Sequence, residues 1–238
     1  MEEVFNMPWI NWAKYSVPEV VFFITGSVMW VVAYIAMLRN DFKNKTLSIP
    51  IINVCLNFTW EAMCAFVFFP DMGLILVIGY WMWFVIDCFI VYSMFKYGKT
   101  QIRQPFLLRF YYPMLIIALA GAFLTQWFWM SGGGPGPLDG WEYPMSPVTA
   151  YTINLVMSVC YIGLLWIPNF KGNLKIIGWM KGLGTGLISV MFYLHYDDLS
   201  EPKNAYLFVL YILCALFDAL YIYLLYKPQL LKAKVSEA

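Results

Sequence analysis

Long apolar runs joined by short polar connections dominate the pattern of hydrophobic and polar positions along this chain. A helix needs about 20 apolar residues to cross a bilayer. Seven runs reach this length, at roughly 18–38, 49–69, 73–95, 107–130, 147–168, 174–195 and 205–226. We therefore predict an all-α polytopic membrane protein in which residues 18–226 form a single bundle of seven transmembrane helices.

The composition supports this prediction. Of the 238 residues, 62% are hydrophobic and 12% are charged, whereas a soluble domain averages roughly half apolar and a quarter charged. The formal net charge of +1 gives no reason to expect a nucleic-acid partner. All five cysteines fall inside predicted spans without metal or disulfide spacing, so we interpret them as small buried hydrophobes.

The two ends of the chain are predicted to lie outside the hydrocarbon core. The first residues include two acids, where a cleaved secretory signal would carry basic residues. Pro8, Trp9 and Trp12 follow, and they are typical of an interfacial segment. We assign residues 1–17 to an interfacial N-terminal segment and residues 227–238 to a cytosolic tail.

The basic residues predict the orientation. Thirteen of the fifteen Lys and Arg lie around the connections after the first, third and fifth spans or in the C-terminal tail, and only Lys14 and Lys203 lie on the other side. The positive-inside rule therefore places the C-terminus in the cytosol and the N-terminus outside or in a lumen. The membrane would be the endoplasmic reticulum in a fungus and the plasma membrane in a bacterium.

One carboxylate interrupts the second run. Glu61 is the sole charged residue between Asn53 and Phe69, and a carboxylate in hydrocarbon costs several kcal/mol, which marks a functional site. Asn53 and Asn57 precede it by eight and four residues, so all three share one side of a helix. Because an amide can hydrogen-bond a carboxyl and hold one protonation state, we predict that both asparagines support Glu61.

Two further acids stand alone in apolar runs, Asp87 in the third and Asp218 in the seventh. We identify no intramembrane arginine to pair with them, and we expect Lys181 to snorkel to the cytosolic end of the sixth span. A rise of 1.5 Å per residue puts Glu61 and Asp218 about 7 Å apart in depth. If the second and seventh helices line one cavity, each end of it should carry a carboxyl.

Two roles are open for each acid. A carboxyl in an apolar pocket favours its neutral form, so it can donate a proton as a general acid. Alternatively, it serves only as an interhelical hydrogen bond worth about 1 kcal/mol or less. Asp87, for example, could pair with Asn154 or Gln126.

Aromatic side chains share helix faces with two of the acids. Tyr221 follows Asp218 by three residues, and Trp83 precedes Asp87 by four. Aromatic faces turned toward a cavity can stabilise a carbocation through cation–π attraction. In a chain with 20% aromatic residues, however, ordinary core packing would also give such neighbours.

Metal-dependent chemistry is not favoured. Asp197, Asp198 and Glu201 have the DDxxE spacing of a magnesium–diphosphate site, but a solvated loop explains them better because only Lys203 is near to bind phosphate. We therefore predict no metal site and no ionisation of a diphosphate.

The Gly/Pro-rich stretch 131–147 is an ordinary connection or a lid over a cavity.

Glycines in the sixth span indicate close packing. Gly178, Gly182 and Gly186 have the small-xxx-small spacing that lets another helix approach, with Gly184 between them. The seventh span contains no lysine between Ala205 and Tyr226, which argues against a retinal protein.

The stretch Asn57-Phe58-Thr59-Trp60-Glu61 in the second span, Asp218 in the seventh, the chain length and the seven spans together carry a family resemblance. The sequence resembles the small membrane-integral terpene cyclases that make meroterpenoids and indole diterpenes. The resemblance implies a substrate with a linear polyprenyl group on an aromatic or polyketide-derived head, often ending in an epoxide. It also implies a cyclisation started by protonation, without a metal or redox cofactor.

The resemblance also implies roles for individual residues. Glu61 and Asp218 match the two catalytic acids of the family. Glu61 would be the proton donor, supported by Asn57 and Trp60, while Asp218 would assist protonation or act near the other end. Asp87 ranks third.

Two other classes of protein remain open at this point. A small proton-coupled seven-helix transporter would explain the acids equally well, but it predicts repeats that we do not find between the first three and last three spans. A receptor-like seven-helix protein ranks third, because the loops are short and carry no receptor motif.

Overall fold

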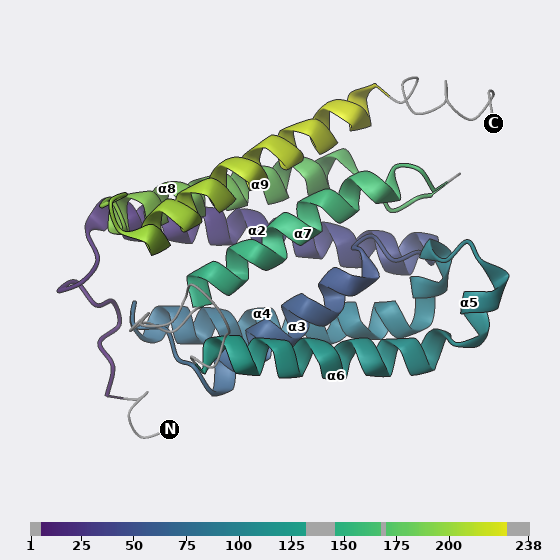
Figure 1. Ribbon diagram of the computed structural model, residues 1–238, viewed down its shortest axis with the longest axis horizontal. Helices are drawn as coiled ribbons and strands as arrows, with labels where there is room; N and C mark the ends of the chain where they lie inside the picture. The colour runs from purple at the N-terminus through teal and green to yellow at the C-terminus, as the bar shows by residue number, and fades with distance from the viewer. Residues whose placement is uncertain (1–5, 132–145, 168–169, 228–238) are drawn as a thin grey trace.

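The computed structural model describes residues 6–131, 146–167 and 170–227, and these residues contain helices but no strand (Figure 1). The predicted lid stretch and cytosolic tail therefore fall almost wholly outside the described residues. The described helices are α2 (Val17–Asn44), α3 (Ile51–Phe66), α4 (Leu74–Tyr97), the 3-10 helix η1 (Gly98–Gln101), α5 (Pro105–Arg109), α6 (Tyr111–Met130), α7 (Ser146–Leu164), α8 (Lys175–His195) and α9 (Pro202–Tyr226).

All seven predicted runs fall on helices, which confirms the all-α fold. Among the described helices, six are long and apolar enough to cross a membrane. Of the seven predicted spans, the exception is α3, which has 16 residues where the sequence predicts about twenty. It begins directly after Pro50 and ends before Pro70, and its length of about 24 Å is less than the thickness of a bilayer core.

The helices form two groups. In Figure 1, α3, α4 and α6 lie along one side and α8 and α9 along the other, with α7 crossing between them. The long helix α2 packs most extensively against α8 and also contacts α4, so it joins the two groups. It begins at one end of the bundle, and α9 ends at the other.

Small residues allow this close packing, as the sequence predicted for α8. A Cβ on Gly184 would lie 2.9 Å from the carbonyl oxygen of Gly26, so α2 and α8 approach backbone to backbone. Gly178 and Gly182 instead face side chains of α9. Gly186 has open space beside it, so the prediction that it belongs to the packing ridge is wrong.

The N-terminal segment is tied to the connection between α3 and α4. The amides of Leu74 and Ile75 donate to the carbonyls of Pro8 and Trp9 at 2.9 and 3.2 Å. Gly73 makes this possible, because its φ of 119° favours glycine and a Cβ there would lie 2.7 Å from both carbonyl oxygens.

Two side chains strengthen this tie at Asp71. Lys14 Nζ lies 2.8 Å from one carboxylate oxygen, and the Tyr15 hydroxyl donates to the other at 2.6 Å. Partial burial acts to raise the pKa of Asp71, but these hydrogen bonds and the charge of Lys14 outweigh it and hold the pKa below its usual value.

We expect Asp71→Asn to destabilise the protein slightly at neutral pH, by about 0.2–1 kcal/mol, because the pair is half exposed. A carboxyl whose folded pKa is lowered adds stability that is complete above the unfolded pKa of 3.8 and is lost as pH falls through the lower folded value. Thermal unfolding in detergent from pH 7 to pH 3 should show the two proteins converging. The exposed Asp197→Asn serves as control, and a difference between the wild type and Asp71→Asn that is as large at pH 3 as at pH 7 would contradict the expectation.

Candidate active site

A cavity of about 110 Å³ lies between the two groups of helices. Its wall comes from α2, α3, α4, α7 and α8, and none of the described residues of α9 lines it. Most of the lining is apolar or aromatic: Phe23, Trp30, Tyr34, Trp60, Tyr80, Trp83, Pro147, Ala150, Tyr151, Ile153, Ile188 and Phe192. The polar residues that line it are Asn57, Glu61, Asn154 and Thr185.

Glu61 is buried and faces this cavity, at 4% exposure. Its Oε1 accepts hydrogen bonds from the Tyr34 hydroxyl at 3.1 Å and from Asn57 Nδ2 at 2.9 Å. Its Oε2 has no hydrogen-bond partner among the described residues. One oxygen of the carboxyl is therefore held by two hydrogen bonds, whereas the other is buried without one.

The amide of Asn57 joins Glu61 to a second acid. The same Nδ2 lies 2.6 Å from the Tyr34 hydroxyl and 3.1 Å from Asp87 Oδ2. Asp87 is buried at 3% exposure. The predicted support of Glu61 by Asn57 is therefore present, and Asp87 pairs with this amide rather than with Asn154 or Gln126. Three helices, α2, α3 and α4, hold the two carboxyls together.

The tryptophans predicted at the site line the cavity. Trp60 Nε1 donates to Thr149 Oγ1 at 2.9 Å, which ties α3 to α7. Tyr80 packs edge-on against both Trp60 and Trp83, with ring centroids 5.4 Å apart in each pair. Trp83 Nε1, like Glu61 Oε2, has no partner among the described residues. Glu61 therefore lies beside a wall of aromatic rings that pack edge-on against one another.

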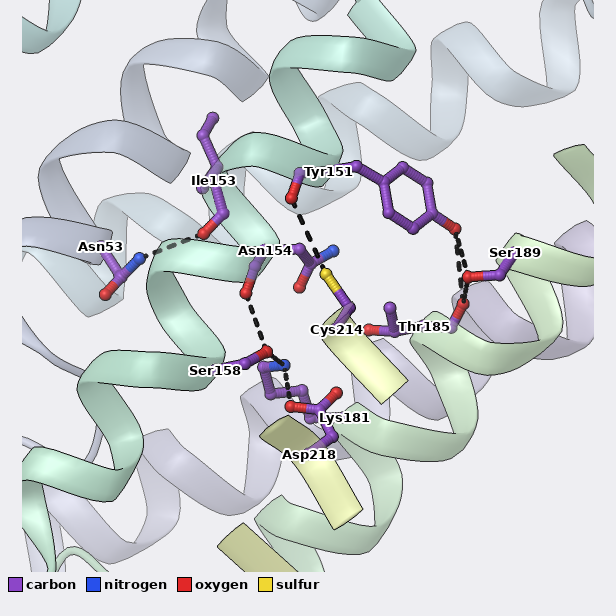
Figure 2. A network of polar contacts seen from close by, with 10 residues as sticks. All are labelled: Asn53, Tyr151, Ile153, Asn154, Ser158, Lys181, Thr185, Ser189, Cys214 and Asp218. Atoms are coloured by element: carbon purple, nitrogen blue, oxygen red, sulfur yellow. Dashed lines mark hydrogen bonds and ion pairs between the residues drawn. The ribbon is translucent and has the colours of Figure 1, made fainter. Parts of the chain in front are cut away.

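Asp218 lies elsewhere, and two expectations about it are wrong. It does not line the cavity, and Lys181 Nζ lies 2.6 Å from its Oδ1, so it has a basic partner. Lys181 does not snorkel: its side chain is 1% exposed, and it also donates to Ser158 Oγ at 2.7 Å. Figure 2 shows this network joining α7, α8 and α9. The sequence failed here because the pairing depends on how α8 rotates relative to α9.

Two other predicted residues are placed away from the cavity lining. Asn53 donates to the carbonyl oxygen of Ile153 at 3.3 Å, so it ties α3 to α7 instead of supporting Glu61. Tyr221 packs against Tyr161 with ring centroids 5.1 Å apart, and its hydroxyl contacts Asn173 Oδ1 at 3.4 Å. Helical spacing predicts which residues share one face of a helix, but it does not specify the neighbouring helix.

A family model described as Pyr4-like transmembrane terpene cyclases matches residues 11–229. This chain belongs to that family. It is 27% identical over 195 residues to the terpene cyclase macJ of Penicillium terrestre, covering 80% of this chain and 73% of the relative. It is 25% identical over 187 residues to the Pyr4-family terpene cyclase mfmH of Annulohypoxylon moriforme, covering 76% and 74%.

A third relative is the terpene cyclase ascF of Acremonium egyptiacum, 25% identical over 171 residues, covering 63% of this chain and 62% of the relative. No solved structure matches the chain significantly. These findings confirm the resemblance derived from the sequence, and they give no support to a transporter.

Sequence reasoning misses two residues that contact the acids. Tyr34 is one of seventeen tyrosines and stands among apolar residues, yet its hydroxyl contacts Glu61 and Asn57. Lys181 was visible as an intramembrane lysine, and its burial with Asp218 could have been suspected because a lone buried charge is costly.

The DDxxE stretch does not resemble a metal site. Asp198 is exposed and accepts hydrogen bonds from the backbone amide and hydroxyl of Ser200 at 3.0 and 2.6 Å. These bonds shape the turn before α9, as a solvated loop would. Within the described part of the chain, no group of three His, Cys, Asp or Glu residues could hold a metal ion.

Proposed function

We propose that this cyclase isomerises a prenylated substrate by protonating a terminal epoxide or alkene with Glu61. The main supporting observation is that Glu61 lines a cavity of aromatic rings and that its Oε2 has no hydrogen-bond partner among the described residues. A general acid must lie within hydrogen-bond reach of the atom that it protonates, and Oε2 is the oxygen free to do so.

The arrangement of Glu61 and Asp87 supports a neutral acid. Both carboxyls contact the same Asn57 amide. Two negative charges so close together in hydrocarbon are costly, so such a pair shares a proton. Because the Tyr34 hydroxyl and the Asn57 amide both donate to Oε1, a proton on Glu61 belongs on Oε2, the oxygen without a partner among the described residues.

The proposed reaction conserves atoms. Glu61 transfers its proton to the epoxide oxygen, the carbon–oxygen bond opens, and alkene electrons form the new carbon–carbon bonds. The positive charge moves along the chain until a carbon–hydrogen bond gives up its proton to a base. With an alkene as the first acceptor, the proton adds to carbon instead. The product is an isomer of the substrate in both cases.

The aromatic wall supplies the second requirement. Trp30, Trp60, Tyr80 and Trp83 come from three helices and surround the space beside Glu61. Their ring faces can stabilise a carbocation as it moves, and Glu61 is the only carboxylate among the described residues that line the cavity, which lowers the risk that the cation is captured early. Trp83 Nε1 is also available to donate to an epoxide oxygen.

Asp218 contributes differently in this proposal. Since it lies behind the cavity wall and pairs with Lys181, we assign it a positioning role through that pair rather than contact with the substrate. Lys181 Nζ lies 5.8 Å from the centroid of the Trp30 ring, which lines the cavity. Loss of the Lys181–Asp218 pair would therefore alter the cavity wall at Trp30.

We also propose the membrane placement. With α3 included, seven helices cross the bilayer, the C-terminus is cytosolic and the N-terminus is lumenal or outside. Residues 1–17 lie at the interface, and residues 227–238 are a cytosolic tail. The host membrane is the endoplasmic reticulum in a fungus and the plasma membrane in a bacterium.

The test is product analysis by mass spectrometry in membranes that carry the protein. Farnesylated phenols with a terminal alkene or a terminal epoxide are supplied in water and in D₂O. We expect a cyclic product of unchanged mass in water. In D₂O the alkene substrate should gain one carbon-bound deuterium, whereas deuterium on the product hydroxyl of the epoxide substrate washes out. If the alkene substrate is converted in D₂O and its product contains no deuterium, protonation is not the first step.

A further inference from the structure

Four buried polar atoms, all on residues that line the cavity, have no hydrogen-bond partner among the described residues. Two of them, Glu61 Oε2 and Trp83 Nε1, belong to the acid side formed by α3 and α4. The other two, Asn154 Oδ1 and Thr185 Oγ1, come from α7 and α8 and have no role in the reaction proposed above. Buried polar groups in folded proteins are nearly always paired, so a pair of unsatisfied atoms in one wall requires an explanation.

Thr185 differs from most other helical hydroxyls of this chain. The hydroxyls of Ser and Thr in helices usually donate to the carbonyl four residues earlier. Five hydroxyls do so here, at 2.7–2.9 Å: Thr25, Thr59, Thr152, Ser158 and Ser189. Thr185 does not, although it is 3% exposed. Ser27 and Ser93 share this feature but do not line the cavity.

The backbone around Asn154 and Thr185 is held firmly. The Ser158 hydroxyl donates to the carbonyl of Asn154 at 2.8 Å, and Ser189 donates to the carbonyl of Thr185 at 2.8 Å. Figure 2 shows the two side chains pointing toward one another from α7 and α8. Two rigid helices thus present an amide and a hydroxyl to the same space, as a preorganised binding site requires.

We propose that Asn154 and Thr185 bind the oxygenated head of the substrate, specifically a hydroxyl group with a neighbouring carbonyl. The amide oxygen of Asn154 accepts from the hydroxyl, and the Thr185 hydroxyl donates to the carbonyl oxygen. Glu61 lines the same cavity from α3, so a head bound at α7 and α8 would leave the far end of the prenyl chain for the acid. The inference rests on the proposed function, because it names the head site of the same cavity.

Two ligands with the same epoxyfarnesyl tail test this site. One carries a methyl 2,4-dihydroxybenzoate head, which has a hydroxyl beside a carbonyl, and the other carries a plain phenyl head. Binding of tritiated ligand is measured in nanodiscs with Glu61→Gln as the parent, so that turnover does not disturb the equilibrium. We expect the parent to bind the oxygenated head at least tenfold more tightly, because the phenyl head leaves both polar atoms unpaired.

Asn154→Leu and Thr185→Val should each reduce this preference about tenfold and leave binding of the phenyl ligand within about twofold. Thr185→Ser keeps the hydroxyl and should keep the preference. Thr152→Val is the matched control on α7, since its hydroxyl bonds to Val148 and does not line the cavity. Thermal unfolding of each variant verifies that it is folded.

The outcomes separate this inference from the proposed function. A parent without preference for the oxygenated head, or a preference that survives both substitutions, overturns the head site. If the preference behaves as expected but the wild-type protein does not isomerise the oxygenated ligand, the head site stands and the proposed function fails.

Discussion

Replacement of Glu61 by glutamine is expected to lower cyclisation by about 10²–10⁴-fold while the protein stays folded. A glutamine amide keeps an oxygen to accept from Tyr34 and Asn57, so the local hydrogen bonds survive. It cannot transfer a proton to an epoxide or alkene, because the amide N–H is far less acidic than a carboxyl. Initial rates of isomer formation in membranes, together with thermal unfolding in detergent, give the two quantities.

Asp87→Asn is the matched comparison, because Asp87 contacts the same amide nitrogen and is equally buried but does not line the cavity. We expect it to lower the rate less than Glu61→Gln, since it alters only the proton balance of the pair. Glu61→Asp, which retracts the carboxyl by one methylene, should retain part of the activity. If Asp87→Asn abolishes the reaction and Glu61→Gln does not, the assignment of the donor is wrong.

Replacement of Lys181 by methionine is expected to destabilise the protein by about 3–5 kcal/mol, because it leaves the Asp218 carboxyl buried without its cation. The double variant Lys181→Met/Asp218→Leu removes both charges and should recover most of this loss, since a buried ion pair contributes little beyond an apolar pair of similar size. Thermal and chemical unfolding of the four members of the cycle measure the coupling.

Lys175→Met is the control for this cycle. Lys175 is exposed on the same helix, with its Nζ 4.0 Å from the centroid of the Tyr226 ring, and its loss should change stability by no more than about 1 kcal/mol. Equal stability of the wild type and Lys181→Met would show that the pair is not formed in the membrane.

The same double variant decides what Asp218 does in the reaction. If its stability recovers and its activity recovers as well, Asp218 acts only by holding α8 against α9. If stability recovers but activity does not, the charge of the pair is needed for chemistry. In that case the catalytic role that the family resemblance implies for Asp218 is the better description.

Local patterns were sufficient for the architecture and for half of the acid cluster. The apolar runs predicted helices because backbone groups in a bilayer must bond within their own segment. The spacing of Asn57 and Glu61, four residues apart, predicted their contact at 2.9 Å because a helix places such side chains on one face. A lone carboxylate in hydrocarbon marked Glu61 because its cost has to be compensated.

Only the tertiary structure decided the contacts between helices. Tyr34 and Asp87 join Glu61, while Asp218 leaves it for Lys181, and no spacing within one helix specifies either event. Each depends on the rotation and crossing of packed helices, which close approaches such as that of Gly26 to Gly184 determine. The sequence by itself thus identified the acids and the membrane fold, and packing decided which acid faces the cavity, because side-chain partners across helices are set by the whole bundle.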